Sequence, residues 1–243
     1  MAETPQPRTD ALADGTAARI VDRHTRDQGE IVVVGLGRFG SALARTLVEM
    51  GYDVLAIDGS PERVQDHVGV LSHVVEADAT SERVLRQLGV VNARTAVVCI
   101  GSDIEASVLA TTALVDLGVP NIWAKAITAA HGRILRRVGA DRVVFPEADM
   151  GQRVAHLVTG AMLEYLDLDD DFVIVETLVP TSAVGKTLGQ ASLRSKHRIT
   201  VVCVKHEGST FTYAESDTVL EAGDRIVIAG HRADVERFAE STR

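Results

Sequence analysis

The sequence predicts an α/β protein, in which a doubly wound parallel sheet of six strands is followed by a connecting helix and a small α+β C-terminal lobe. From Ile31 onward, short apolar runs alternate with helical patterns, as in successive βαβ units. These runs are apolar along nearly their whole length, which is typical of strands that helices cover on both faces. After Phe172 the pattern changes to strands joined by turns, with only short helices between them.

The predicted parallel sheet takes its strands from six runs: IVVV, DVLAID, SHVVEAD, TAVVCI, NIWAKA and RVVFP. Helix signals lie between them. Ser60 followed by Pro61 is a start signal, because proline fits the first helical position. Helix ends are marked by glycines, which tolerate the left-handed conformation: Gly51, Gly89, Gly118 and Gly139. We therefore place the first domain at residues 30–147.

The regions on either side of this domain have different patterns. Residues 1–29 are polar and lack a sustained period, so we expect a flexible tail. Residues 148–170 are predicted to form the connecting helix, because apolar residues follow helical spacing as far as Leu166. The acidic run Asp167–Asp171 is interpreted as a turn, and residues 171–243 as the C-terminal lobe.

Composition limits the classes of function. The formal net charge of -9 counts against nucleic-acid binding, which needs a basic surface, so we expect no nucleic-acid partner. The two cysteines, Cys99 and Cys203, lie in apolar runs and are expected to be buried thiols of a reducing compartment. The sequence shows no long apolar span and no signal-peptide pattern, so we expect a cytoplasmic protein.

A glycine loop is the strongest local motif. Gly35, Gly37 and Gly40 follow a strand and open a helix with the spacing G-x-G-x-x-G, and Asp58 ends the second strand 18 residues later. In a Rossmann-like fold such glycines bring the backbone close to phosphate, and the acidic residue accepts hydrogen bonds from a ribose. The alternative is a glycine turn without a ligand.

Arg38, within this loop, is placed where phosphates would lie, and arginine binds phosphate bidentately. It could assist a pyrophosphate, reach the terminal phosphate of a nucleoside di- or triphosphate, or be a solvent-exposed helix residue. Asp78 and Thr80 end the third strand and could border the base. Thr80 and Ser102 could equally be simple helix caps.

No residues for hydride transfer or hydrolysis stand out. His131 alone is interpreted as structural, and no Ser/His/Asp or Cys/His arrangement can be argued. We therefore expect a protein that is not an enzyme. An NAD-dependent oxidoreductase and a free-standing NAD(H) redox sensor remain the alternatives.

Several stretches together resemble one family: VVGLGRFGSALARTLVEMGYDVLAID, EADATSERVLRQLGV, IWAKA and GADRVVFPEADMG. They are similar to the regulatory subunit of Ktr/Trk-type potassium uptake systems, in which a nucleotide-binding RCK domain (also called TrkA-N) precedes a small C-terminal lobe. The resemblance implies a gating protein on the inner face of the membrane, partnered by a potassium-translocating subunit. It also implies homodimers that assemble into a ring, as an octamer, whose shape depends on bound ATP or ADP; NAD(H) can occupy the same site.

The resemblance assigns roles by position. Arg38 would reach a terminal phosphate, including one held by the neighbouring subunit, and Asp58 would hold the ribose. Glu147 would help to hold a divalent cation such as Mg²⁺ between subunits; the alternative is an acid favoured by a helix dipole. The remaining cofactor-binding residues that it implies are Gly35, Gly37, Phe39, Gly40, Asp78, Ala79, Thr80, Gly101 and Lys125.

The C-terminal lobe resembles the family in pattern only. In some members it binds cyclic di-AMP at a dimer interface, and Arg198, Ile199 and Val201 lie in the corresponding region. The stretch TFTYAESDTVL lacks the proline expected there, which counts against this second ligand.

Overall fold

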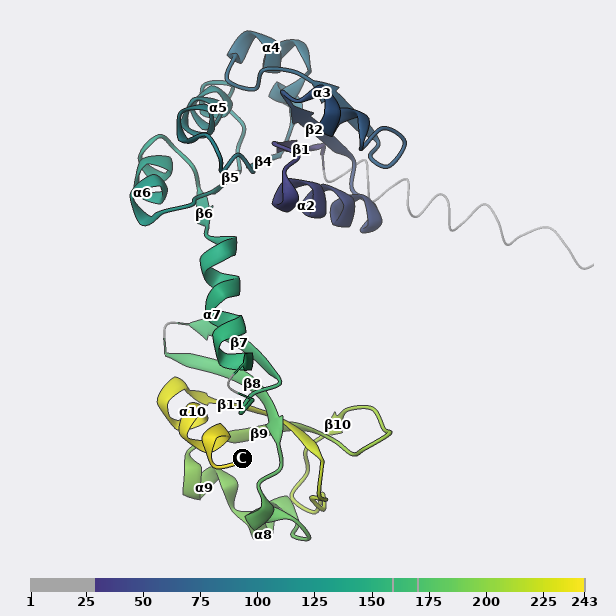
Figure 1. Ribbon diagram of the computed structural model, residues 1–243, viewed down its shortest axis with the longest axis vertical. Coiled ribbons are helices and arrows are strands. Elements are labelled where there is room, and N and C mark those ends of the chain that lie inside the picture. Colours follow the sequence, from purple (N-terminus) through teal and green to yellow (C-terminus); the bar gives the residue numbers. More distant parts are fainter. Residues whose placement is uncertain (1–28, 159, 170, 243) are drawn as a thin grey trace, which may run out of the picture. The chain divides into compact units, whose positions relative to one another are not determined.

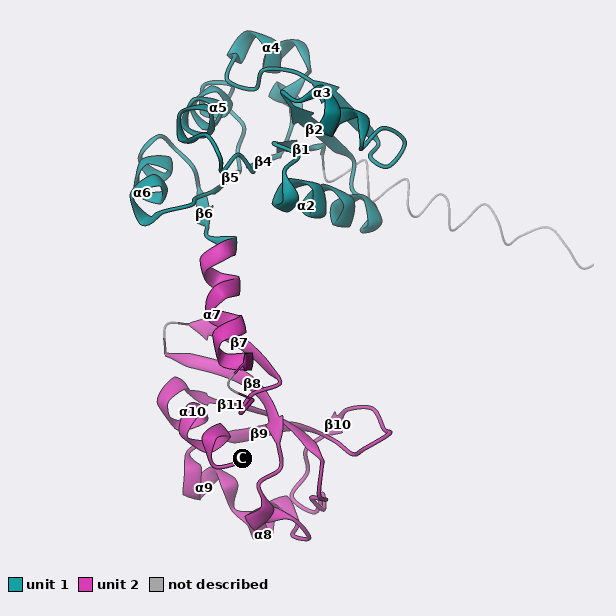
Figure 2. Cartoon of the chain, in the orientation of Figure 1, with its two compact units in different colours: residues 1–146 teal, residues 147–243 magenta. Residues whose placement is uncertain are grey.

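The computed structural model describes residues 29–158, 160–169 and 171–242. The chain divides after Pro146 into two compact units (Figure 2). Apart from Gly29, the predicted N-terminal tail lies outside the described residues.

The first unit contains a parallel sheet of six strands in the order β3-β2-β1-β4-β5-β6 (Figure 1). This order confirms the predicted doubly wound fold, because the chain starts in the middle of the sheet and builds outward in both directions. The strands are β1 (Ile31–Val34), β2 (Val54–Asp58), β3 (His73–Glu76), β4 (Thr95–Val98), β5 (Ile122–Lys125) and β6 (Arg142–Val144).

Helices cover both faces of this sheet, as the apolar strands require. In β1, Val33 belongs to a core cluster that includes Ala44 of α2, whereas Val32 and Val34 belong to a cluster with α4, α5 and α6. The helical elements of the unit are α2 (Arg38–Glu49), α3 (Pro61–Gln65), α4 (Glu82–Gln87), η1 (Val90–Asn92), α5 (Ile104–Asp116) and α6 (Ala129–Arg137).

The second unit is an antiparallel sheet in the order β10-β9-β11-β8-β7, with α10 against β8 and β11. Val175, Ile228 and Phe238 are among its fully buried core residues. Its elements are α7 (Pro146–Val158), β7 (Glu164–Asp169), β8 (Phe172–Leu178), η2 (Thr181–Ala183), α8 (Leu188–Ala191), α9 (Leu193–His197), β9 (Thr200–Lys205), β10 (Thr212–Tyr213), β11 (Arg225–His231) and α10 (Arg232–Glu240).

The prediction of a helix reaching Leu166 is wrong in its second half. The helix α7 ends at Val158, and the next described residue, Gly160, has a left-handed backbone with φ of 74°. The chain then enters β7, which pairs with β8 and buries Tyr165 in the core of the lobe. Asp167 and Asp169 belong to β7 and not to a turn. Pairing with β8 therefore overrides a residue spacing that also fits a helix.

In the described part of the chain, we find no helix that combines the length and the apolar character needed to cross a membrane.

Candidate functional site

The glycine loop connects β1 to α2 at the carboxyl edge of the parallel sheet. Gly35 has φ of 94°, a conformation that favours glycine. Gly40 lies so close to the loop that a Cβ atom there would be 1.8 Å from the carbonyl oxygen of Gly35. These two glycines are therefore required by the turn and by the close approach of α2.

Gly37 has a different role. It is the N-cap residue of α2, its side-chain position faces open space, and no side chain caps the helix. The first amides of a helix lack partners within the helix, and the helix dipole places partial positive charge there. An uncapped and accessible start of α2 is thus suited to bind a phosphate.

Asp58, the last residue of β2, is hydrogen-bonded to the glycine loop. It is 6% exposed, and its Oδ2 accepts a hydrogen bond of 2.6 Å from the amide of Leu36. Its Oδ1 accepts one of 2.8 Å from the amide of Ser60, and Arg63 reaches Oδ2 at 3.4 Å. The carboxylate thus holds the loop in place, and it lies at the position that in this fold contacts a ribose.

A buried cation stands at the ends of the neighbouring strands. Lys125, at the end of β5, is 8% exposed, and its Nζ lies 5.8 Å from the ring centroid of Phe39. It packs over Gly101, where an added Cβ would come within 3.3 Å of Nζ. Burial raises the pKa of the Cys99 thiol to about 12, and the Lys125 charge opposes that rise. The structure thus brings Gly101, Phe39 and Lys125 together.

Asp78 and Thr80 form a small hydrogen-bonded turn after β3. Oδ1 of Asp78 accepts from the Thr80 hydroxyl at 2.7 Å and from its amide at 2.9 Å. These bonds, the hydroxyl first, lower the pKa of the Asp78 carboxyl. Ala79 is buried in the core, so only its backbone can face a base. Neither Thr80 nor Ser102 is a helix cap, because the N-cap residues are Ser81 for α4 and Asp103 for α5.

Arg38 is the exposed first residue of α2, and it ion-pairs with no acidic side chain among the described residues. It lines an open groove of about 520 Å³ together with Ser41, Ala42, Arg45, Asp66 and His67. This exposed position at the start of α2 is compatible with each of the three interpretations of Arg38.

Three further positions singled out by the sequence lie in the second unit. Glu147 is an exposed residue in the first turn of α7 and belongs to the second unit, so its role as a cation ligand rests on the resemblance alone. In the C-terminal lobe, Ile199 is 1% exposed, so its side chain lies in the core and cannot line a pocket. Arg198 is exposed and pairs with Asp234 at 3.4 Å.

Sequence analysis missed two contributors to the site. The amide of Leu36 and the guanidinium of Arg63 gave no local signal, because their contacts with Asp58 depend on how β2, α2 and α3 pack. His131 is 1% exposed and receives a hydrogen bond from the Ile127 amide, which agrees with its structural interpretation.

Comparisons with known proteins define the class of protein. The model of the TrkA-N domain matches residues 31–146, and the model of the TrkA-C domain matches residues 173–242. Ktr system potassium uptake protein A of Bacillus subtilis (strain 168) is 37% identical over 210 residues, which cover 86% of this chain and 95% of that protein. The protein of the same name from Vibrio alginolyticus is 33% identical over 202 residues, covering 83% and 92%. The chain therefore belongs to the TrkA-N/TrkA-C family that includes the Ktr system potassium uptake proteins.

Solved structures show the same fold at lower identity. The crystal structure of the GsuK RCK domain aligns with a TM-score of 0.61 and 21% identity, covering 98% of this chain and 50% of that one. The structure of the GsuK channel bound to NAD aligns with a TM-score of 0.58 and 22% identity, covering 92% and 39%. This chain thus spans half or less of those longer proteins.

Proposed function

We propose that this protein is a cytoplasmic regulatory subunit of a membrane potassium transporter, and that it gates the transporter by binding ATP or ADP at the glycine loop. The kinship with potassium uptake proteins over nearly their full length supports the transporter role. The observation that carries nucleotide binding is the uncapped, accessible start of α2 at Gly37, beside the buried carboxylate of Asp58.

The proposed binding mode follows from the site. The first amides of α2 would hold the phosphates, Asp58 would accept the ribose hydroxyls, and the turn at Asp78 and Thr80 would border the adenine. Lys125 adds positive charge at the same edge of the sheet. A divalent cation such as Mg²⁺, where bound, would neutralise phosphate charge, with Glu147 as its carboxylate ligand.

Gating requires that the two nucleotides favour different shapes of an assembly. We propose a homo-oligomer, a ring of eight chains built from dimers. The exposed residues Met150, Val154 and Val158 lie four residues apart on α7 and form an apolar stripe that a second copy would cover. Light scattering on the full chain with nucleotide should give an octamer mass, and a monomer at micromolar concentration would contradict the ring.

Arg38 is the proposed source of the difference between ATP and ADP. A guanidinium contact to a terminal phosphate that ADP lacks would supply an allosteric coupling of about 1–3 kcal/mol, or roughly 5- to 150-fold. Arg38→Ala should bind both nucleotides but lose most of the ATP/ADP affinity ratio. Arg45→Ala is the matched control, since Arg45 is exposed and lines the same groove.

One titration tests the proposal and its alternatives. Binding of ATP, ADP, NADH and cyclic di-AMP is measured by calorimetry, with and without magnesium, in the wild type, Arg38→Ala and Glu147→Gln. Asp149→Asn, an exposed acid of the same helix turn, serves as the control for Glu147. Potassium flux is then measured in vesicles with the translocating subunit. Potassium flux that does not change when ATP or ADP is added would refute the gating role.

The alternative of NAD(H) binding, as an oxidoreductase or a redox sensor, is favoured by the same glycine spacing followed by Asp58. It predicts tight NADH binding and weak ATP binding in that titration. Steady oxidation of NADH by small carbonyl compounds, abolished by a change in the site, would establish the enzyme and exclude our proposal.

A further inference from the structure

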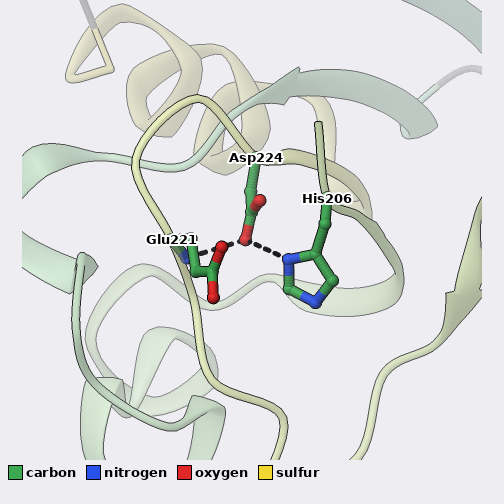
Figure 3. A group of neighbouring side chains, drawn as sticks. All are labelled: His206, Glu221 and Asp224. Carbon is green, nitrogen blue, oxygen red and sulfur yellow. Dashed lines mark hydrogen bonds and ion pairs between the residues drawn. The ribbon is translucent and has the colours of Figure 1, made fainter. Parts of the chain in front are cut away.

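Three potential metal ligands converge in the second unit, and none of them is a residue given a role above. His206 directly follows β9, and Asp224 directly precedes β11. The two strands are antiparallel neighbours in which Lys205 pairs with Arg225, so His206 and Asp224 lie across from each other. Glu221 belongs to the turn before Asp224. The donor atoms of the three side chains all lie within 4.8 Å of one another (Figure 3).

Hydrogen bonds hold the central carboxylate in place. Oδ2 of Asp224 accepts from the backbone amide of Glu221 at 2.7 Å and lies 2.9 Å from Nδ1 of His206. The backbone carbonyl of Asp224 accepts from the Val179 amide at 2.9 Å. Asp224 is therefore positioned before any ligand arrives, while the side chains of Glu221 and His206 remain accessible and can adjust.

The charge of the cluster points to a cation. Asp224 is 1% exposed, and its one ion-pair partner among the described residues is His206. The cluster thus combines a buried carboxylate, an accessible carboxylate and an imidazole, all of them side chains that bind divalent metals. A buried carboxylate without a permanent positive partner is unfavourable, and a divalent cation would neutralise both carboxylates.

We propose that His206, Glu221 and Asp224 form a site for a divalent transition-metal ion of the Zn²⁺ class. Zinc takes imidazole nitrogen and carboxylate oxygen at about 2.0–2.2 Å, so ligand atoms in a tetrahedral site lie about 3.3–3.6 Å apart. Nδ1 of His206 and Oδ2 of Asp224 are 2.9 Å apart, as in a hydrogen bond, and would separate by about 0.4–0.7 Å to take the ion. The carboxylate of Glu221 lies within 4.8 Å of the other two donor atoms, and rotation of this exposed side chain would bring it closer to them.

Binding requires one rearrangement of a proton. Because an ionised carboxylate only accepts, Nδ1 of His206 carries the hydrogen in its bond to Asp224. On metal binding this proton leaves Nδ1, and the imidazole, with its remaining hydrogen on Nε2, offers the Nδ1 lone pair to the ion. Three protein ligands leave a fourth position for water. The ion would fix the end of β9 to the turn that precedes β11.

The test is a Zn²⁺ titration of the full chain after treatment with a chelator, using a chromophoric competitor and no nucleotide. We expect one Zn²⁺ per wild-type chain, and affinity at least tenfold weaker in His206→Gln and in Glu221→Gln. Glu221→Gln keeps the backbone amide that holds Asp224, so it should fold normally. Co²⁺ in the wild type should show the strong visible absorption of four-coordinate cobalt.

The matched control is His231→Gln. His231 lies 3.0 Å from Asp171 in a similar but exposed pair, and within the described ranges that pair belongs to no group of three ligands. Zn²⁺ affinity should be unchanged in this variant. Absence of stoichiometric binding, equal affinity in the wild type and Glu221→Gln, or loss of binding in His231→Gln would each overturn the assignment. Nucleotide binding plays no part in the experiment, so its result is independent of the proposed gating role.

Discussion

Replacing Asp58 by alanine should weaken the first unit even without a ligand. The change removes the acceptor for the amide of Leu36, a residue that is 2% exposed, and the acceptor for the amide of Ser60, which is partly exposed. A buried amide that loses a charged acceptor costs about 1.5–3 kcal/mol, and one that water can reach costs less. The ion pair with Arg63 adds little, because Arg63 is exposed. We expect a loss of about 2–4 kcal/mol in the free energy of unfolding.

Urea unfolding followed by tryptophan fluorescence measures this loss in the first unit, which contains Asp58. Trp123 is the only tryptophan of the chain and lies in β5, with Arg142 over its ring at 4.8 Å. With a slope of about 2 kcal/mol per molar urea, the midpoint should fall by about 1–2 M. Asp53→Ala is the control, because Asp53 is an exposed acid just before the same strand, and its change should stay within about 0.5 kcal/mol.

The same variant separates the structural role of Asp58 from its role at a ligand. Loss of a charge-assisted bond to ribose should lower adenine-nucleotide affinity by about 10- to 100-fold, on top of the change in stability. A midpoint equal to that of the control would refute the bond between Asp58 and the glycine loop. A lower midpoint with unchanged nucleotide affinity would leave Asp58 as a structural residue and refute the ribose contact.

Three further outcomes are expected. Gly40→Ala should lower the free energy of unfolding by more than about 3 kcal/mol or prevent folding, whereas Gly37→Ala should stay within about 1 kcal/mol and weaken nucleotide binding; urea titration and calorimetry distinguish them. Cys99, with a pKa of about 12, should alkylate far more slowly at pH 8 in the native protein than in urea, measured by mass spectrometry; equal rates would contradict its burial. Thr80→Val should raise the pKa of Asp78 toward its ordinary value, as measured by an NMR titration. The lowered pKa of Asp78 stabilises the wild-type fold at pH values above the ordinary carboxyl pKa, and this contribution is lost as the pH falls. The variant should therefore lose less stability than the wild type on acidification.

The parallel sheet could be predicted from the sequence because each of its signals is local. Apolar runs specify buried strands. Pro61 begins α3, and Gly89 directly follows the C-cap residue of α4, as their residue types predict. The connecting region could not be predicted in the same way. Ala161, Met162 and Tyr165 have a spacing that fits a helix, but all three are buried in the core of the lobe, and the pairing of β7 with β8 makes Tyr165 part of a strand. Gly160 was the available local signal for the end of the helix.

In the candidate sites, too, some features follow from local sequence patterns and others depend on how strands pair. The positions of Gly37 and Asp58 follow from the strand-turn-helix pattern, but the bond from the Leu36 amide to Asp58 joins residues 22 apart and depends on how two strands align. The cluster of His206, Glu221 and Asp224 is a stronger case. In the sequence, the segment that contains β10 separates His206 from Glu221 and Asp224. Only the register of β9 against β11 brings the three residues together.

The two cations near the glycine loop differ in exposure, and this difference bears on the proposed recognition of ATP and ADP. Lys125 is buried at the sheet edge, packed over Gly101 and near Phe39, so its charge acts at a fixed place close to the strands. Arg38 is exposed on the first turn of α2, with a long side chain that faces an open groove. ATP and ADP differ only at the terminal phosphate, which lies farthest from the ribose and therefore from Asp58. In the proposed binding mode, a cation that discriminates between them has to reach that phosphate, which is why the proposal gives this role to the exposed Arg38 and not to the buried Lys125.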